Sequence, residues 1–249
     1  MTTPWPYPLW IAHRGAGKLA PENTLAAFRL GAQYGYAAFE CDVKLSSDDV
    51  PFLLHDAALE RTTKDAGVAG EQPWAALSQL DAGGWHSRRY AGEPMPTLTA
   101  VAHYVRRNRF ALNIEIKPTP GHEEHTGRVV ARDAARLWIH DPLPPLLSSF
   151  KPAALQAAQE VAPALPRALL VDTLWDGWFE CAQSLACVAV VANHELWDQA
   201  LVERVQAAGM RTLAYTVNED AVARRLLAIG VDGLITDAVD HFSPSEPRP

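Results

Sequence analysis

The chain has 249 residues, of which 48% are hydrophobic and 20% are charged, so it holds enough apolar material for one large core. This composition excludes a disordered chain, and the length excludes a small module. The 29 acidic and 22 basic residues give a formal net charge of −7, and no run of Lys or Arg offers the basic stripe that follows a phosphate backbone. We therefore expect no nucleic-acid partner.

The N-terminal segment is rich in proline and has no basic stretch, and nowhere do about 18 consecutive apolar residues occur. This pattern predicts a cytoplasmic protein without stable membrane anchoring. The cysteines, Cys41, Cys181 and Cys187, lack the C-x-x-C spacing of metal sites, and their odd number argues against a disulfide framework. We expect them to be reduced core residues. No pattern in the sequence indicates the oligomeric state.

The chain repeats one unit, which consists of an amphipathic helix, a glycine that ends it and a short aliphatic strand. Apolar residues at helical spacing precede Gly35, Gly209 and Gly230, with Trp197 opening the second of these helices. Strands are expected at residues 9–13, 39–43, 111–116, 146–149, 168–171, 188–191, 212–216 and 233–236. Eight strands that alternate with helices run parallel and close most naturally into a (β/α)8 TIM barrel, with an open doubly wound sheet as the alternative.

Residues 57–98 break this rhythm, because they are rich in glycine and proline and contain one weak helical stretch at 74–80. We interpret them as an insertion in a single domain that spans residues 1–242. Its place after a strand that leads to His55 makes it a candidate substrate-side lid over the carboxyl ends of the strands. The proline-rich residues 243–249 are expected to form a flexible tail.

Two of the predicted strands carry rows of polar side chains. Glu40 and Asp42 lie two residues apart, so both carboxylates point to the same face of their strand. Asn113, Glu115 and Lys117 share one face of the next strand in the same way. A barrel turns both rows inward. The alternative is that Glu40 and Asp42 are solvated strand-end charges paired with Lys44 or Lys117.

If Glu40, Asp42 and Glu115 converge in the interior, they require a compensating cation, because an unpaired buried carboxylate costs several kcal/mol. Cys41 points to the opposite face of the strand, and no His-x-x-x-His spacing occurs nearby, so three carboxylates favour a hard cation over zinc. We therefore predict one divalent cation, Mg²⁺ or Ca²⁺, and ligand type alone does not separate the two.

His13 and His55 each follow an apolar predicted strand, at the face where barrel enzymes build their sites. Two histidines at one such face indicate a general acid and a general base. The planar fork of Arg14 suits a phosphate, and Lys117 adds a point charge beside the carboxylates. These cations predict a phosphoryl substrate. The other seven histidines are interpreted as structural.

The motifs resemble those of the glycerophosphodiester phosphodiesterase family, in the family's order and over about residues 10–242. They are His13-Arg14-Gly15, Pro21-Glu22-Asn23-Thr24, Glu40-x-Asp42, His55-Asp56, Arg61-Thr62-Thr63, Glu115-x-Lys117 and Thr216-Val217-Asn218. The resemblance implies a TIM barrel that hydrolyses glycerophosphodiesters, such as glycerophosphocholine or glycerophosphoethanolamine, to glycerol 3-phosphate and an alcohol, with a divalent cation.

Carried over position by position, the resemblance implies a full set of site residues. These are His13 and His55 as the catalytic pair, Glu40, Asp42 and Glu115 as metal ligands, and Arg14, Lys117 and Tyr215 as substrate-binding residues. Tyr215 departs from the pattern, because the family often has Trp there, and the change bears on the alcohol-side specificity.

We expect His13 to act as the base and His55 as the acid, with attack by water or by the substrate's own glycerol hydroxyl. Two other functions remain open from the sequence. One is a phospholipase-type phosphodiesterase that acts on intact lipids, and the other is a non-catalytic barrel that binds a phosphorylated ligand.

Overall fold

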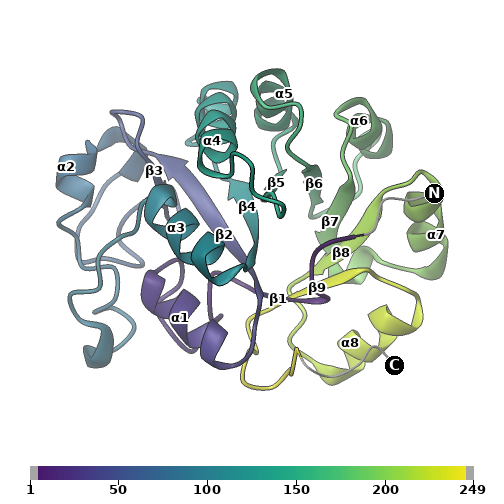
Figure 1. Ribbon diagram of the computed structural model, residues 1–249, viewed down its shortest axis with the longest axis horizontal. Helices are drawn as coiled ribbons and strands as arrows, with labels where there is room; N and C mark the ends of the chain where they lie inside the picture. The colour runs from purple at the N-terminus through teal and green to yellow at the C-terminus, as the bar shows by residue number, and fades with distance from the viewer. Residues whose placement is uncertain (1–4, 245–249) are drawn as a thin grey trace.

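Eight parallel strands form a closed ring in residues 5–244, the part of the chain that this computed structural model describes. In ring order they are β1 (Trp10–Ala12), β2 (Ala38–Leu45), β4 (Ala111–Ile116), β5 (Leu146–Ser149), β6 (Arg167–Val171), β7 (Ala189–Asn193), β8 (Arg211–Tyr215) and β9 (Gly233–Thr236). β9 pairs with β1, and β1 pairs with β2 through Ala12 and Phe39, which closes the ring (Figure 1). The predicted TIM barrel is confirmed, and each predicted strand lies within two residues of its observed bounds.

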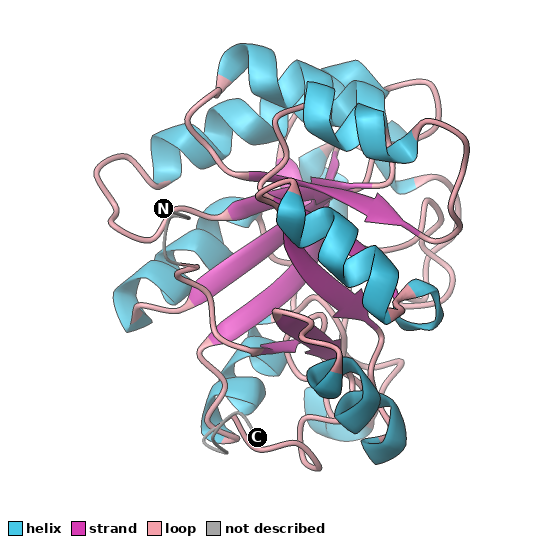
Figure 2. Ribbon diagram, turned by 90° about the vertical axis from the view of Figure 1, so that its right-hand side faces the viewer, coloured by secondary structure: helices cyan, strands magenta, loops and turns pink. Residues whose placement is uncertain are grey.

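Helices cover the outside of the ring (Figure 2). They are α1 (Leu25–Gln33), α3 (Leu98–Asn108), α4 (Glu123–Leu137), α5 (Pro152–Val161), α6 (Trp178–Ser184), α7 (Gln199–Ala207) and α8 (Asp220–Ala228). α7 and α8 end just before Gly209 and Gly230, whose φ angles of +80° and +85° are of the left-handed kind that glycine adopts without strain. α7 begins later than predicted, because Asp198 caps it and leaves the buried Trp197 outside the helix.

The interior of the ring is apolar at its amino end and polar at its carboxyl end. Side chains that alternate along the strands form an apolar floor, made of Tyr7, Ile11, Ala38, Ala111, Leu146, Ala168, Leu170, Ala189, Val191, Leu213 and Ile235. The next inward positions toward the carboxyl ends of β2, β4 and β5 carry Glu40, Asn113 and Ser148. Cys41 points the other way, into the core between the ring and its helices, as predicted. The polar chemistry is therefore confined to the mouth of the barrel.

β3 (Pro51–Leu53) lies outside the ring and runs antiparallel to β2, with Leu53 opposite Val43 and Pro51 opposite Leu45. The sequence predicted His55 at the mouth on the assumption that its strand runs parallel to the strand before His13, and this assumption was wrong. His55 reaches the mouth because β2 extends beyond the ring and β3 folds back along it, so that Leu54 N–H donates to the Asp42 carbonyl.

The segment between β3 and α3 has a small hydrophobic core of its own. It contains the helix α2 (Trp74–Leu77) and two short 3-10 turns, η1 (Ala69–Glu71) and η2 (Arg88–Tyr90). Its buried side chains are Phe52, Leu54, Leu59, Ala69, Leu77, Ala82 and Met95. This satellite cluster fixes the segment beside the mouth, at the left of Figure 1.

Two expectations concern the ends of the chain. The tail predicted at 243–249 lies mostly outside the described residues, which end at residue 244. Within residues 5–244, none of the helices combines the length and the apolar character needed to cross a membrane.

Candidate active site

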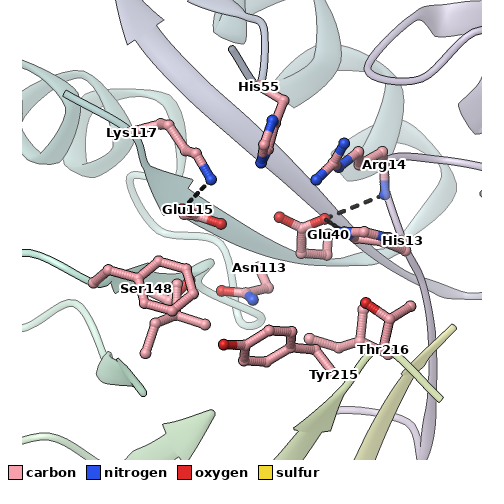
Figure 3. A pocket seen from close by; sticks show the side chains of 13 residues that line it. His13, Arg14, Glu40, His55, Asn113, Glu115, Lys117, Ser148, Tyr215 and Thr216 are labelled. Carbon is pink, nitrogen blue, oxygen red and sulfur yellow. Dashed lines mark hydrogen bonds and ion pairs between the residues drawn. The ribbon is translucent and has the colours of Figure 1, made fainter. Parts of the chain in front are cut away.

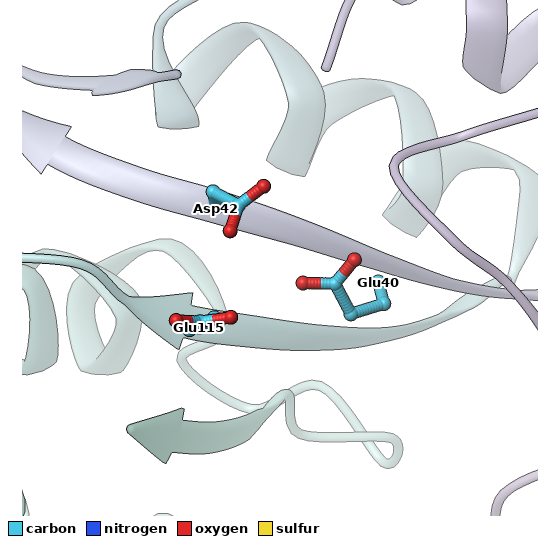
Figure 4. Close-up of side chains that lie close together, drawn as sticks. All are labelled: Glu40, Asp42 and Glu115. Carbon is cyan, nitrogen blue, oxygen red and sulfur yellow. The ribbon is translucent and has the colours of Figure 1, made fainter. Parts of the chain in front are cut away.

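Three carboxylates converge at the mouth of the barrel. Glu40 and Asp42 come from β2 and Glu115 from β4, where the strand register sets Asp42 beside Glu115. One oxygen of each residue lies within 4.8 Å of the others, and all three residues are buried (Figure 4). The predicted convergence is therefore present, and the alternative of separate, solvated strand-end charges is wrong.

The three acids differ sharply in their affinity for protons. Burial, with the nearby charges of Asp42 and Glu115, raises the pKa of Glu40 well above its usual value. Burial and Asp42 raise the pKa of Glu115 to about 7. Burial also opposes ionisation of Asp42, but Arg14 and Lys117 outweigh it and hold the pKa of this carboxyl below its usual range. Arg14 and Lys117 therefore do not fully neutralise the negative charge that the three carboxylates carry when all are ionised.

Asp42 is held between an amide and two cations. Asn23 Nδ2 donates to Asp42 Oδ2 at 2.8 Å, and the Asp42 N–H donates to Asn23 Oδ1 at 3.1 Å. Arg14 Nε lies 3.3 Å from Oδ2, and Lys117 Nζ lies 3.5 Å from Oδ1 and 2.9 Å from Glu115 Oε1. Oδ1 of Asp42 accepts no hydrogen bond from any described residue. Apart from the ion pair with Lys117, this buried oxygen has no partner among the described residues, so it can also bind a metal cation.

His13 lies beside Glu40 and is oriented by Asp237, a residue near the C-terminal end of the chain. Its Nδ1 lies 2.6 Å from Asp237 Oδ1, and its Nε2 lies 3.8 Å from Glu40 Oε2. Asp237 follows β9 and is held by Asn218, whose Oδ1 accepts from the Asp237 N–H at 2.8 Å. Although burial opposes it, the hydrogen bond from His13 lowers the pKa of Asp237, so this carboxyl is ionised at neutral pH.

His55 is oriented by a second carboxylate, and that carboxylate belongs to a chain of ion pairs. Its Nδ1 lies 2.6 Å from Asp56 Oδ1. Arg61 bridges Asp56 to Glu22, to which it donates two hydrogen bonds of 2.7 Å, and Glu22 accepts from Arg14 Nη1 at 2.9 Å. Burial lowers the pKa of His55, which favours its uncharged form. The chain of pairs therefore links His55 to the Arg14 guanidinium.

These groups surround one pocket of about 170 Å³. Figure 3 shows His13, Arg14, His55 and Lys117 around its rim, with Tyr215 on the opposite wall. The Tyr215 ring packs edge-on against Phe150, and its hydroxyl lies 3.3 Å from the Val171 carbonyl. All eight site residues predicted from the sequence thus lie in or directly beside this pocket.

Three residues that the structure brings to the site were not among the predicted site residues. Asn23 was named within the Pro21-Glu22-Asn23-Thr24 motif but was given no role of its own. In the structure Thr24 caps α1 and Asn23 binds Asp42. Asp237 was not singled out, although an acid directly after a barrel strand lies at the mouth by topology. Lys44, two residues after Asp42, is buried and donates to the Lys117 carbonyl at 3.1 Å, and burial lowers its pKa to about 8.

Comparison with solved structures supports an assignment to a class of enzyme. The chain superposes with a TM-score of 0.88 on a phosphodiesterase of Oleispira antarctica that was solved with its product sn-glycerol-3-phosphate; the two are 35% identical, over 94% of this chain and 95% of the other. A glycerophosphodiester phosphodiesterase of Agrobacterium tumefaciens gives a TM-score of 0.79 at 27% identity, over 95% and 99% of the two chains. The protein is a TIM-barrel hydrolase of phosphoric diesters.

The family follows from the sequence comparisons. The model of the glycerophosphoryl diester phosphodiesterase family matches residues 13–241. A putative glycerophosphodiester phosphodiesterase of Bacillus subtilis is 31% identical, over 93% of this chain and 95% of its own length. A glycerophosphodiester phosphodiesterase of Caldanaerobacter subterraneus is also 31% identical, over 92% and 93% of the two chains. The chain belongs to the glycerophosphoryl diester phosphodiesterase family.

Proposed function

We propose that this protein hydrolyses glycerophosphodiesters, such as glycerophosphocholine or glycerophosphoethanolamine, to glycerol 3-phosphate and an alcohol. The observation that carries the proposal is one pocket that is lined by His13, His55, Arg14 and Lys117 and that adjoins the cluster of three buried carboxylates. The product complex of the Oleispira relative supports a glycerol phosphate as the retained half of the substrate.

The carboxylate cluster fits one divalent cation. Its donor set is three hard oxygens, a buried Asp42 oxygen accepts no hydrogen bond, and the raised pKa values of Glu40 and Glu115 reflect charge that a cation would neutralise. Glu40, Asp42 and Glu115 would hold Mg²⁺ or Ca²⁺. When bound, the ion would act as a Lewis acid that stabilises negative charge on the phosphoryl oxygens.

Arg14 and Lys117 bind the phosphodiester in this proposal. Their side chains border the same pocket from opposite sides of Asp42, at 3.3 Å and 3.5 Å from its carboxylate. The guanidinium offers paired donors to an anionic oxygen, and the ammonium offers a point charge. Both stabilise the charge that develops on the phosphoryl oxygens in the transition state.

His13 and His55 divide the proton transfers. One ring accepts the proton of the attacking hydroxyl, and the other protonates the departing alkoxide. Attack by water gives glycerol 3-phosphate directly. Attack by the neighbouring glycerol hydroxyl gives a cyclic phosphate, which water then opens to glycerol 3-phosphate. The lowered pKa of His55 supports its acting as the acceptor, with His13 as the donor. The opposite division expected from the sequence requires His55 to carry a proton at neutral pH, and a pH–rate profile of each single variant decides between them.

The inserted segment borders the site on the side of His13. Trp85 and His86 line a second hollow of about 330 Å³ together with His13, Arg14 and Asp237. This position supports the prediction of a substrate-side lid, which we place within a single domain of residues 1–242. Tyr215, on the wall of the first pocket, is proposed to contact the substrate. A cytoplasmic location and the lack of stable membrane anchoring stay predictions from the sequence.

The test is a coupled assay for glycerol 3-phosphate with several headgroups, with and without a chelator. We expect release from soluble glycerophosphodiesters that stops when the ion is removed. With metal saturating, His13→Ala and His55→Ala are each expected to lower turnover by about 10²-fold or more. Retention of more than about a tenth of the wild-type rate by either variant contradicts the two-histidine scheme. Activity confined to intact lipids would favour the phospholipase-type alternative.

A further inference from the structure

Two buried polar side chains at the bottom of the pocket have no hydrogen-bond partner. Asn113 is 4% exposed and Ser148 is fully buried. Neither the amide nitrogen nor the amide oxygen of Asn113, nor the hydroxyl of Ser148, makes a hydrogen bond with any residue in the described part of the chain. Buried polar groups in folded proteins are nearly always paired, because an unpaired one loses its water contacts without compensation.

Their positions on the strands place them directly beside two of the clustered acids. In the β2–β4 register Asn113 lies beside Glu40, and in the β4–β5 register Ser148 lies beside Glu115. Both line the 170 Å³ pocket. Figure 3 shows Asn113 between the row of carboxylates and the Tyr215 ring. The two groups are thus directed at the space that lies one layer deeper than the rim where the phosphate is proposed to bind.

The opposite side of this deep space is apolar. Leu170 of β6 and Ile235 of β9 line the same pocket, and both belong to the apolar floor of the barrel. A ligand that fits here has hydroxyl groups on one side and C–H groups on the other. An anion does not fit, because Asn113 and Ser148 carry no charge and the cations Arg14 and Lys117 lie at the rim.

We propose that Asn113 and Ser148 bind the hydroxyl groups of the glycerol moiety, and so select glycerol phosphates over phosphates of simple alcohols; this rests on the function proposed above. An amide and a hydroxyl each offer both a donor and an acceptor, which is what an alcohol requires. A ligand that lacks the hydroxyls leaves both buried groups unpaired. A site of this kind discriminates strongly against such an analogue.

The test compares two ligands in the metal-loaded protein, sn-glycerol 3-phosphate and n-propyl phosphate, which lacks the hydroxyls. We expect the wild type to bind glycerol 3-phosphate at least about tenfold more tightly, as measured by calorimetry. Ser148→Ala, Asn113→Leu and the double variant are expected to lose most of this preference by weakening glycerol 3-phosphate alone. Their affinity for Mg²⁺ is expected to stay unchanged, and a weakened affinity would overturn the assignment in favour of a metal-binding role.

The neighbouring serine provides a matched control. Ser149 is also buried, but it faces out of the ring and donates to the Ile116 carbonyl at 2.7 Å. Ser149→Ala is expected to lower the melting temperature and to leave the ligand preference unchanged. Ser148→Ala is expected to keep or raise the melting temperature, because it removes a polar group that has no partner in the free protein.

Besides a weakened affinity for Mg²⁺, three outcomes overturn the inference. The first is an unchanged preference in Ser148→Ala and Asn113→Leu, which would mean that water alone satisfies these groups. The second is a loss of turnover of bis(p-nitrophenyl) phosphate, a diester without glycerol, to the same extent as glycerophosphocholine, which would mean general damage to the site. The third is a wild type that releases no glycerol 3-phosphate, which alone would overturn the proposed function as well.

Discussion

His13 Nδ1 and Asp237 Oδ1 lie 2.6 Å apart, although 224 positions separate the two residues in the chain. The contact is possible because β1 and β9 are neighbours in the ring, and both residues follow the carboxyl ends of these strands. An ionised carboxylate at Nδ1 fixes the tautomer and the orientation of the imidazole, so that Nε2 faces the pocket. Asp237 is therefore a positioning residue for the proposed catalytic histidine.

Asp237→Asn is expected to lower kcat by about 10²-fold or more, because the amide can hold the ring in the wrong tautomer. The melting temperature is expected to change little, since the amide keeps the size of the side chain. The pH–rate profile is expected to lose or shift the limb that belongs to His13. Asp240→Asn, an exposed acid three residues further on, is the control and is expected to behave as wild type. A kcat for Asp237→Asn within about threefold of wild type would contradict this role.

Arg61→Lys is expected to lower kcat by about tenfold with metal affinity unchanged, because lysine keeps the charge but cannot bridge Asp56 and Glu22 at once. Without this bridge, Asp56, which orients His55, is no longer tied to Glu22, which binds Arg14. Steady-state kinetics and metal titration measure the two quantities. Lys64→Ala, an exposed cation of the same segment, serves as the control. An equal fall in metal affinity would show that the bridge supports the carboxylates instead.

Glu115→Gln is expected to stabilise the metal-free protein above about pH 7, because the folded state raises the pKa of this carboxyl from 4.5 to about 7. Between these values the folded protein holds a proton that the unfolded chain releases, so the metal-free wild type loses stability as the pH rises through about 7. The gap in melting temperature between variant and wild type should therefore shrink from about pH 8 to about pH 6. A gap independent of pH would contradict the assigned shift. With metal added, the wild type should have the higher melting temperature at high pH, because only the wild type keeps all three carboxylate ligands.

Asp198→Ala is expected to destabilise the protein by about 1 kcal/mol, because the Asp198 carboxylate accepts from the Leu201 N–H at the first turn of α7. Asp198→Asn keeps a hydrogen-bond acceptor at the cap, so its free energy of unfolding is expected to fall much less. Denaturant unfolding measures both. Since α7 lies on the outside of the ring, kcat is expected to stay at the wild-type value, which makes this pair a reference for stability effects unconnected with the site.

The strands and their inward faces were predictable because polar side chains recur at every second position along β2 and β4, in Glu40-x-Asp42 and Glu115-x-Lys117. The barrel then fixes where those faces meet. The same local reasoning could not place β3, because an antiparallel return and a parallel crossover look alike in a short apolar run. The turn-forming residues between Leu45 and Val50 were the available signal.

The partners of the site residues were harder to predict than the residues themselves. Asn23 lies directly before Thr24, the cap of α1, and nothing in this spacing indicates its contact with Asp42. In the structure Asn23 has a left-handed φ of +59°. The unpaired state of Asn113 and Ser148 depends on what surrounds them in three dimensions. No spacing along the chain reports this.

Because β3 lies outside the ring, the positions of the two imidazoles depend on different parts of the fold. His13 follows β1, which is a strand of the ring. His55 follows β3, which packs on the satellite cluster around Phe52. A lesion in that cluster, such as Leu77→Ala, would leave the ring and its three acids intact. Such a variant would still bind the metal ion and glycerol 3-phosphate but would lose turnover, although no residue of the barrel had changed.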